Sequence, residues 1–323
     1  MTCKRKGCKM DWGKTKTLLI VLLIAANLIA AFMYARLRYD KTMLPEEIVD
    51  GAVENLTSKG VKVQDGAIMR KKQNLAIYTA VKEKPEDCTE YLKKALDTML
   101  PEAGTYSEVA IPDGVGAVKT TETDEMSAEL TSNSLLTAVS GKLSEAEREN
   151  ICGVLRSVSD CEAPASADAA KMTAVKRFYS ALCKNSKRGG ADFGFRAFEV
   201  REYGGGEIIF CAQTADGVTL PEYISRFYFS PTGELALVYG HFFVGEAEKA
   251  YSATLLDGVN LIYKMNLENV SEIIGERDAF SVIAIEGDNF YFVPSYSVIY
   301  KDKKGNIANH IYDSVTGELK SRI

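Results

Sequence analysis

The sequence predicts an α+β fold with a single N-terminal transmembrane helix, followed by an extracytoplasmic part in which antiparallel sheets pack with helices. Three observations lead to this fold class. Residues 17–35 form one apolar run. Beyond it, segments with helical spacing of apolar residues stand beside segments in which apolar and polar residues alternate. Glycine-containing turns separate the alternating segments, mainly in the second half of the chain.

The apolar run contains no charged residue, proline or glycine. Its 19 residues, at about 1.5 Å each in a helix, roughly match the thickness of a hydrocarbon core. A cleaved leader usually has a shorter apolar region that ends in a small-x-small site. The best sites here end at Ala31 or Ala35, and Ile29 or Met33 occupies the outer small position. We therefore favour an uncleaved signal-anchor over a leader that is removed.

Basic residues predict the orientation of this span. Six Lys or Arg residues precede the run and three follow it before Thr42. Since positive residues stay on the cytoplasmic side, we expect a single-pass cell-membrane protein with residues 1–16 as a cytoplasmic basic tail. Nine of the 39 basic and two of the 44 acidic residues precede Thr42, so the remainder carries about twelve excess negative charges. Such a surface is a poor match for nucleic acid.

The extracytoplasmic part is long enough for two domains. We expect a first α+β domain at residues 42–160 and a second, β-rich α+β domain at residues 169–323. The loop-like composition of residues 160–168 marks the boundary between them.

In the first domain, residues 44–59 predict a helix that Gly60 ends. Residues 61–68 and 75–81 alternate like two strands joined by a turn. A second helix is expected over 86–100, and the polar, Thr-rich stretch 115–130 predicts exposed strands.

Near the end of the first domain, Ser144 and Glu147 form the pattern of a capping box at a helix start. The residues 169–183 predict a helix with a core-facing apolar stripe. Six further strands and one more helix are expected. The strands are 193–203, 207–214, 224–229, 235–243, 296–300 and 307–312, and the helix is 253–265. Two Ser-x-Thr-Gly-Glu turns, at 230–234 and 314–318, hint at a repeated unit.

Cysteine usage leaves the pairing open. Five cysteines are expected outside the membrane, an odd number, so at least one is unpaired within the chain. They are Cys88, Cys152, Cys161, Cys183 and Cys211. Cys3 and Cys8 in the tail are either inert thiols or sites of acylation. No C-x-x-C pair occurs, which leaves no zinc-knuckle or thioredoxin-type motif.

The sequence shows no catalytic constellation. His241 and His310 are the only histidines, and no nucleophile signature accompanies either of them. No cluster of His, Cys and carboxylates has metal-ligand spacing. We therefore expect a protein that is not an enzyme and that holds no metal or cofactor.

The anchor itself carries the candidate binding residues. Ala26, Ala30 and Ala31 lie close to one helical face with Asn27 beside them, a pattern that lets two helices approach and lets an amide bond across the contact. At the membrane surface, Trp12, Lys14 and Lys16 suit the headgroup layer.

Asp11 is costly near an anionic surface. It is compensated either by a basic residue of a partner or locally, by Lys14 or by capping of the Thr15 N–H.

The stretch Met-Asp-Trp-Gly-Lys-Thr-Lys-Thr at 10–17, running directly into a single apolar span, resembles the start of YycI proteins. A nine-residue extension precedes it, unless translation begins at Met10. YycI belongs to the YycH/YycI family of membrane-anchored regulators in Gram-positive bacteria. The resemblance implies contact with a WalK-type (YycG) sensor histidine kinase, largely through transmembrane helices, with a YycH-like protein as companion.

From this resemblance we expect a non-catalytic regulator of a two-component sensor kinase, embedded in membrane lipid. Two alternatives remain open at this point. One is an extracytoplasmic module that binds cell-wall material, and the other is an anchored hydrolase that uses His241 or His310.

Overall fold

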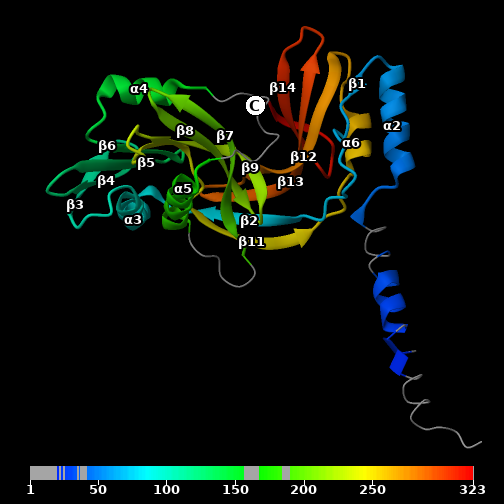
Figure 1. Ribbon diagram of the computed structural model, residues 1–323, viewed down its shortest axis with the longest axis horizontal. Helices are drawn as coiled ribbons and strands as arrows, with labels where there is room; N and C mark the ends of the chain where they lie inside the picture. The colour runs from blue at the N-terminus through cyan, green and yellow to red at the C-terminus, as the bar shows by residue number, and fades with distance from the viewer. Residues whose placement is uncertain are drawn as a thin grey trace, which may run out of the picture.

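The computed structural model describes residues 42–155, 167–183 and 190–322, and ahead of them residues 20, 21, 23, 24, 26–34 and 36. The fold is mixed α+β and is dominated by one large connected sheet (Figure 1). The helices are α2 (Glu46–Ser58), the 3₁₀ helix η1 (Pro85–Cys88), α3 (Thr89–Met99), α4 (Glu145–Gly153), α5 (Ala169–Leu182) and α6 (Gly258–Lys264).

The strands of the first half are β1 (Lys62–Val63), β2 (Ala76–Lys82), β3 (Thr105–Ile111), β4 (Gly114–Thr120), β5 (Glu125–Thr131) and β6 (Leu135–Ser140). Those of the second half are β7 (Phe193–Tyr203), β8 (Gly206–Ala215), β9 (Val218–Phe229), β10 (Leu235–His241), β11 (Gly245–Ser252), β12 (Val270–Ala284), β13 (Asn289–Asp302), β14 (Ile307–Asp313) and β15 (Leu319–Arg322).

The main path through the sheet runs β11-β2-β13-β12-β9-β10-β6-β5-β4-β3. Strands β7 and β8 extend from β9, β14 and β15 extend from β13, and β1 pairs with β12. Strands from the two predicted domains, 42–160 and 169–323, pair with each other where β2 lies between β11 and β13 and where β6 lies beside β10. Residues 160–166 of the predicted boundary lie outside the described ranges, and the division stays a prediction.

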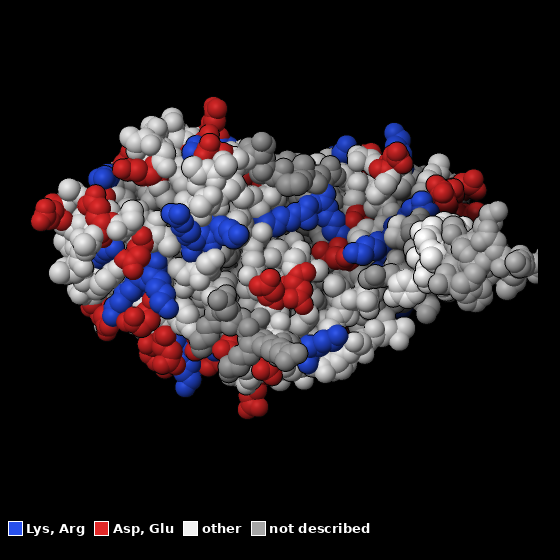
Figure 2. Space-filling view, turned by 60° about the horizontal axis from the view of Figure 1, so that its bottom comes forward, with Lys and Arg blue, Asp and Glu red and all other residues white. Residues whose placement is uncertain are grey.

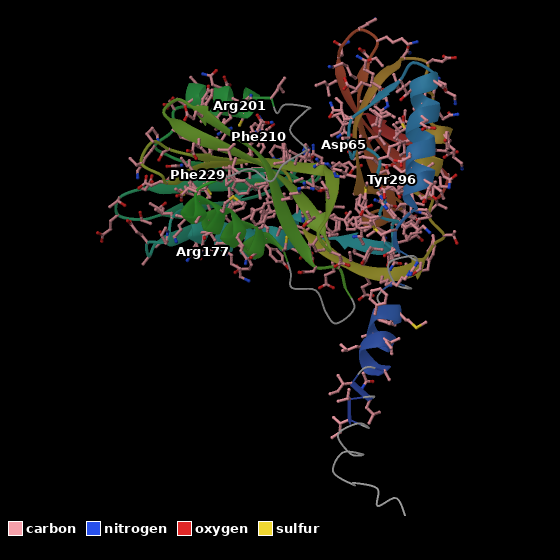
Figure 3. All side chains as sticks on the ribbon, turned by 45° about the vertical axis from the view of Figure 1, so that its right-hand side comes forward. Asp65, Arg177, Arg201, Phe210, Phe229 and Tyr296 are labelled. Atoms are coloured by element: carbon pink, nitrogen blue, oxygen red, sulfur yellow. The ribbon has the colours of Figure 1, made fainter. Side chains whose placement is uncertain are left out.

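Two groups of buried side chains stabilise the two ends of the sheet. At one end, α3 and α5 lie side by side (Figure 1); α3 packs on β4 and β5, and α5 packs on β7. Phe178 of α5 is fully buried there and packs edge-on against Phe227, with ring centroids 5.5 Å apart. At the other end, α2 and α6 pack over a cluster that includes Leu56, Ile262 and Tyr296. Figure 3 shows Phe229 and Tyr296 in these two separate regions.

The structure confirms three helices that the sequence predicts: α2, α4 and α5. The Ser144 Oγ accepts the Glu147 N–H and the Glu147 carboxylate accepts the Ser144 N–H, at 3.3 and 2.9 Å, which is the predicted capping box of α4. Helix α5 begins and ends within one residue of its predicted bounds and buries Val175, Phe178 and Tyr179. The predicted helix at 44–59 is α2.

The predicted hairpins of the second half are also confirmed. β7 and β8 meet at the glycine triplet, where Gly204 and Gly205 have φ of 58° and 79°. The two Ser-x-Thr-Gly-Glu segments are turns, between β9 and β10 and between β14 and β15. Gly233 and Gly317 supply the left-handed residue in these turns, with φ of 86° and 77°.

The expected strand pair at 61–68 and 75–81 is wrong as a hairpin. β1 is two residues long and pairs in parallel with β12, whereas β2 pairs with β11 and β13. A turn closed by the Ala67 N–H and the Gln64 carbonyl, with Gly66 at φ 71°, ends β1 early. Long-range partners therefore replace the local pairing.

Two further expectations need correction. The strands at 115–130 are not simply exposed, because β4 and β5 bury Ala117, Met126 and Ala128 against α3. The helix expected at 253–265 begins only at Gly258, after Asp257 caps it by accepting the Asn260 N–H at 2.8 Å.

Candidate functional site

The predicted anchor residues fall in two groups. Asp11, Trp12, Lys14 and Lys16 lie outside the described residues. Ala26, Asn27, Ala30 and Ala31 lie on a helix that extends away from the folded part (Figure 1), and their side chains are exposed.

The large apolar side chains described on the same helix are all more than half exposed, from 55% at Leu23 to 69% at Phe32. An exposed apolar surface of this kind marks a contact with lipid or another protein. Within the described residues, no helix combines the length and the apolar character that crossing a membrane requires.

The cysteines are packed rather than bridged in the described ranges. Cys152, Cys183 and Cys211 carry free thiols, and burial raises the pKa of Cys183 to about 12 and that of Cys211 further. Cys88 is buried in the core beneath α3. Cys3, Cys8 and Cys161 lie outside the described residues. The described thiols therefore resemble structural cysteines rather than reactive ones.

The two histidines lie apart from each other. His310 of β14 has its ring between two tyrosines, with Nδ1 3.2 Å from the Tyr300 Oη and 3.4 Å from the Tyr312 Oη. Partial burial lowers the pKa of His241, at the end of β10. Among the described residues, no three or more His, Cys, Asp or Glu side chains are grouped to hold a metal ion.

Charged side chains of both signs are interspersed over the face shown in Figure 2. A groove between α3 and α5 has the same mixed character, since Lys94, Lys176 and Arg177 line it together with Asp97. Neither surface distinguishes one kind of ligand.

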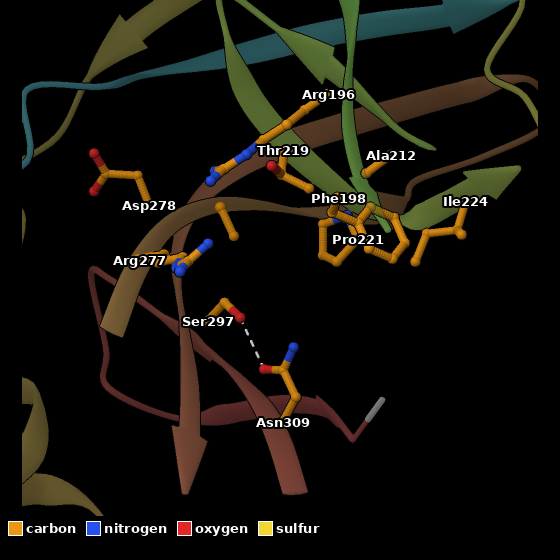
Figure 4. Close-up of a pocket in the computed structure, with 11 residues that line it drawn as sticks. Arg196, Phe198, Ala212, Thr219, Pro221, Ile224, Arg277, Asp278, Ser297 and Asn309 are labelled. Carbon is orange, nitrogen blue, oxygen red and sulfur yellow. Dashed lines mark hydrogen bonds between the residues drawn. The ribbon is translucent and has the colours of Figure 1, made fainter. Parts of the chain in front are cut away.

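One cleft in the sheet is chemically distinct. It has a cavity volume of about 50 Å³ and opens where β7, β8 and β9 approach β12, β13 and β14 (Figure 4). We call it the arginine cleft. Its lining residues are Arg196, Phe198, Ala212, Thr219, Pro221, Ile224, Arg277, Asp278, Ala279, Ser297 and Asn309.

An irregularity in β9 shapes this cleft. β9 meets β12 through a single parallel pair, Thr219 with Ala279. On its other side the register against β8 shifts, because Ala212 pairs with Ile224 and Gln213 pairs with Leu220. The intervening stretch contains Pro221, which lacks an N–H and is tolerated at such a bulge. The bulge turns this part of β9 aside and opens space between the two sheet halves.

Strand alternation places the two arginines in the cleft. Arg196 follows Phe195, which stacks on Tyr179 on the opposite face of β7. Arg277 follows Glu276 in the same way on β12, so Glu276 and Asp278 share the other face. Figure 4 shows both guanidinium groups directed to the same side of the cleft, with the Asp278 carboxylate turned away.

The remaining polar lining consists of groups that can donate hydrogen bonds. The Ser297 hydroxyl donates to the Asn309 carbonyl oxygen at 2.8 Å. The Asn309 amide nitrogen points away from Ser297, across the cleft (Figure 4). Thr219 adds a hydroxyl on the β9 side. The cleft therefore combines two permanent positive charges, neutral donors and an apolar wall.

Behind the cleft lies a group of buried acids. Glu276 is 5% exposed, and its Oε2 accepts the Met69 N–H at 2.9 Å. Burial, together with the negative charges of the neighbouring Asp278 and Asp257, raises the pKa of Glu276 to about 8. Burial also raises the pKa of Asp278.

The comparisons with known proteins give distant structural similarity alone. An uncharacterized protein from Eubacterium rectale is similar over 81% of this chain and 89% of its own, with 12% identity and a TM-score of 0.47. The C-terminal domain of YpeB from Bacillus megaterium is similar over 75% of this chain and 98% of its own, with 12% identity and a TM-score of 0.36. No family model and no curated protein matches the sequence.

Proposed function

We propose that the chain is a non-catalytic, membrane-anchored regulator of a sensor histidine kinase of the WalK/YycG type, working beside a YycH-like protein. One observation carries the proposal: the Met-Asp-Trp-Gly-Lys-Thr-Lys-Thr stretch at 10–17 continues without a break into the apolar run. That combination resembles the start of YycI proteins.

The geometry near the membrane supports this arrangement. The apolar helix exposes its large side chains, as a segment in contact with lipid and other helices would. Only ten residues separate Ala35 from the start of α2 at Glu46. In the proposed orientation, with the N-terminus in the cytoplasm, the folded part lies outside the cell close to the bilayer. It can then reach the external part of a neighbouring membrane protein.

The proposed contact face on the anchor consists of small residues and one amide. Ala26 and Ala30 are four positions apart, so they lie on one side of the helix with Asn27 adjacent. Small side chains let the backbones of two helices approach, and an interhelical hydrogen bond from Asn27 contributes about 1 kcal/mol. Packing must supply most of the affinity. The chain shifts the signalling equilibrium of the kinase by binding one of its states more tightly than the other.

The alternative of an anchored hydrolase receives less support. His310 lies between Tyr300 and Tyr312, and neither of these side chains is the serine or cysteine nucleophile of a hydrolytic triad. His241 lies in a different strand. The alternative of a ligand-binding module is compatible with a kinase regulator, because the same chain can bind a ligand outside and a kinase in the membrane.

Co-purification from native membranes tests the proposal. The full-length chain with Asn27→Leu and Ala30→Leu should recover about tenfold less kinase, a loss that corresponds to about 1.4 kcal/mol of binding free energy. The matched control carries Val21→Leu and Phe32→Leu, which lie on the opposite side at about 100° per residue. It should recover as much kinase as the unchanged chain. Equal recovery with both double variants, or no kinase with the unchanged chain, would contradict the proposal.

A further inference from the structure

We propose that two copies of the chain pair through the outer edges of their β3 strands, so that one continuous sheet crosses a two-fold axis between them. The occupant of this edge is a second copy of the chain in the same membrane. Self-association of this kind depends on the folded part and on the direction in which the anchor helix leaves it. It goes beyond the regulator proposal, because it would hold whichever protein the anchor contacts.

The edge of β3 lacks the features that usually protect a sheet edge from further pairing. In the described part of the chain, the strands that pair on one side only are β1, β3, β7, β11 and β15. β1 is two residues long, and the register of β7, β11 and β15 against their neighbours shifts at a bulge or irregularity. Short strands and bulges protect an edge, as do lysine and proline. β3 pairs with β4 without a shift and contains neither lysine nor proline.

The side chains of β3 leave the edge open to a second copy. All of them are exposed except that of Ile111, which is half-buried. Tyr106 and Val109 are 38% and 39% exposed. The only charged side chain in the strand, Glu108, forms an ion pair with Lys93 of α3 at 3.0 Å. The edge therefore offers apolar and hydroxyl-bearing side chains, and its one charge is compensated within the chain.

The backbone groups that point away from β4 follow from the alternation of the strands. The Ser132 N–H donates to the Asp113 carbonyl oxygen at 2.9 Å. Every second residue from Asp113 along β4 therefore directs its backbone groups to β5, and the residues between them direct theirs to β3. Val118 is one of the latter and pairs with Ser107, so the backbone groups of Ser107 point to β4. The alternate residues of β3 direct their N–H and C=O groups outward: Tyr106, Glu108 and Ala110.

The residue on the two-fold axis follows from the groups that would then meet. With Glu108 on the axis, two carboxylates would stand opposite each other, which is destabilising. A displacement of one residue toward the turn would bring Tyr106 opposite Pro112, which has no N–H to donate. A displacement the other way puts Ser107 on the axis and Tyr106 opposite Glu108 of the second copy. Larger displacements shorten the overlap, so we expect Ser107 at the axis.

The anchor brings a second copy to the position that this edge requires. The two-fold axis of an antiparallel strand pair stands perpendicular to the sheet. α3 packs on the lower face of β4 and β5, and the anchor helix also extends downward from the folded part (Figure 1). The axis therefore runs roughly along the anchor, and both anchors can enter one bilayer. Each copy then holds its β3 edge at the same height above the lipid, and confinement to the membrane raises the effective concentration, so a short contact suffices.

Oxidative crosslinking of the purified full-length chain in liposomes tests the pairing and its register. On the proposed axis, position 107 forms a non-hydrogen-bonded pair with itself, with Cα atoms about 4.5 Å apart. A disulfide needs about 4.4–6.8 Å between Cα atoms. We therefore expect Ser107→Cys to give a covalent dimer that a reductant reverses.

Val109→Cys is the matched control, on the same face of the same strand. Its two copies would lie about 14 Å apart along the strand direction, so no disulfide can join them. It should give no more dimer than the unchanged chain, whose native cysteines set the background. Equal yields from Ser107→Cys and Val109→Cys, or no dimer above the background from Ser107→Cys, would overturn the proposal.

A proline in the edge tests the backbone bonds directly. The Glu108 N–H points outward, so Glu108→Pro keeps the bonds to β4 and removes a bond to the second copy. Glu108→Gln is the matched control, because it loses the ion pair with Lys93 and keeps the N–H. Measured by single-molecule photobleaching in liposomes, the dimer affinity should fall about tenfold or more with Glu108→Pro and change less than about twofold with Glu108→Gln.

Circular dichroism checks that both Glu108 variants fold. If folded Glu108→Pro dimerises like the unchanged chain, or if Glu108→Gln loses as much affinity, the edge of β3 does not hold the dimer. If Glu108→Pro does not fold, the contrast between Ser107→Cys and Val109→Cys decides the matter, because both keep the backbone N–H.

A strand of a different protein is the alternative occupant, and native membranes distinguish the two. A photoreactive residue at position 107 should link the chain to a second copy of itself. A product with a different protein in place of the dimer would overturn the proposal. Kinase recovery with Asn27→Leu and Ala30→Leu tests the regulator proposal separately, because these substitutions leave β3 unchanged.

Discussion

The carboxyl group of Glu276 gives a stability prediction with a defined pH window. It lies on β12 with 5% exposure, and only its Oε2 receives a hydrogen bond, from the Met69 N–H at 2.9 Å. The start of α6 crowds it, since a Cβ on Gly258 would lie 2.1 Å from Oε2. Asp278, Asp257 and the Tyr296 ring surround the same space. We expect Glu276 to be protonated in the folded protein at neutral pH.

The sign of the pH effect follows from the raised pKa. The folded chain holds the Glu276 proton up to a pKa of about 8, whereas the unfolded chain releases it near the ordinary value of 4.5. Between these values the unfolded state binds fewer protons, so the free energy of unfolding falls as pH rises. At about 1.4 kcal/mol per pKa unit, the loss across this window is about 5 kcal/mol. Below about pH 4.5 the carboxyl group is protonated in both states, so it has almost no effect on the free energy of unfolding.

Glu276→Gln tests this reasoning, because glutamine keeps the shape and cannot ionise. Relative to the unchanged chain, the variant should gain about 3 kcal/mol of unfolding free energy between pH 5 and pH 8. Urea unfolding of the full-length chain in nanodiscs, followed by circular dichroism, measures the difference. Asp65→Asn, at an exposed position in the loop after β1, is the matched control and should leave the pH profile unchanged. A Glu276→Gln profile parallel to that of the unchanged chain would refute a protonated buried Glu276.

Three further substitutions test the packing by the same unfolding assay. Phe178→Ala should cost about 4 kcal/mol, because the ring is fully buried against Phe227; a loss below 1 kcal/mol would place it outside the core. Gly240→Ala should cost about 3 kcal/mol, since its φ is 152° and a Cβ would lie 2.3 Å from a β9 carbonyl oxygen. Gly153→Ala, with open space around it, is the control and should cost much less. Ser144→Ala should cost about 1 kcal/mol through loss of the α4 cap, and an unchanged stability would argue against that cap.

The parts of the fold that sequence analysis predicts are those with signals a few residues apart. Ser144 and Glu147 are three positions apart, and the apolar stripe of α5 repeats at each helical turn. The turn at 230–234 contains its own glycine. In each case the residues that determine the conformation also contact one another, so the pattern is sufficient.

The strand pairings that sequence analysis does not predict depend on contacts between residues far apart in the chain. β12, the longest strand at Val270–Ala284, pairs with β1, β9 and β13. Two of these partners are far from it in sequence, and no local pattern specifies them. β2 likewise finds its partners in β11 and β13 rather than in the segment before it. Helical and hairpin periodicity gives no information on such pairing.

The arginine cleft is invisible in the sequence for the same reason. Arg196 and Arg277 each stand in an alternating strand, where a charged residue usually marks a solvent face. Their convergence depends on the β9 bulge and on the single contact of β9 with β12. Pro221 within a strand is the one local signal, because proline is disfavoured inside a regular strand and indicates an irregularity.

Photo-crosslinking from the anchor in intact membranes is the most direct test of the central claim, that residues 17–35 remain attached and bind other helices in the lipid. A photoreactive residue at position 27 should give a product that contains both the full-length chain and a sensor histidine kinase. The same group at position 32, on the opposite side, should give much less of it. Recovery of a mature chain that lacks residues 17–35, or equal products from both positions, would contradict the account.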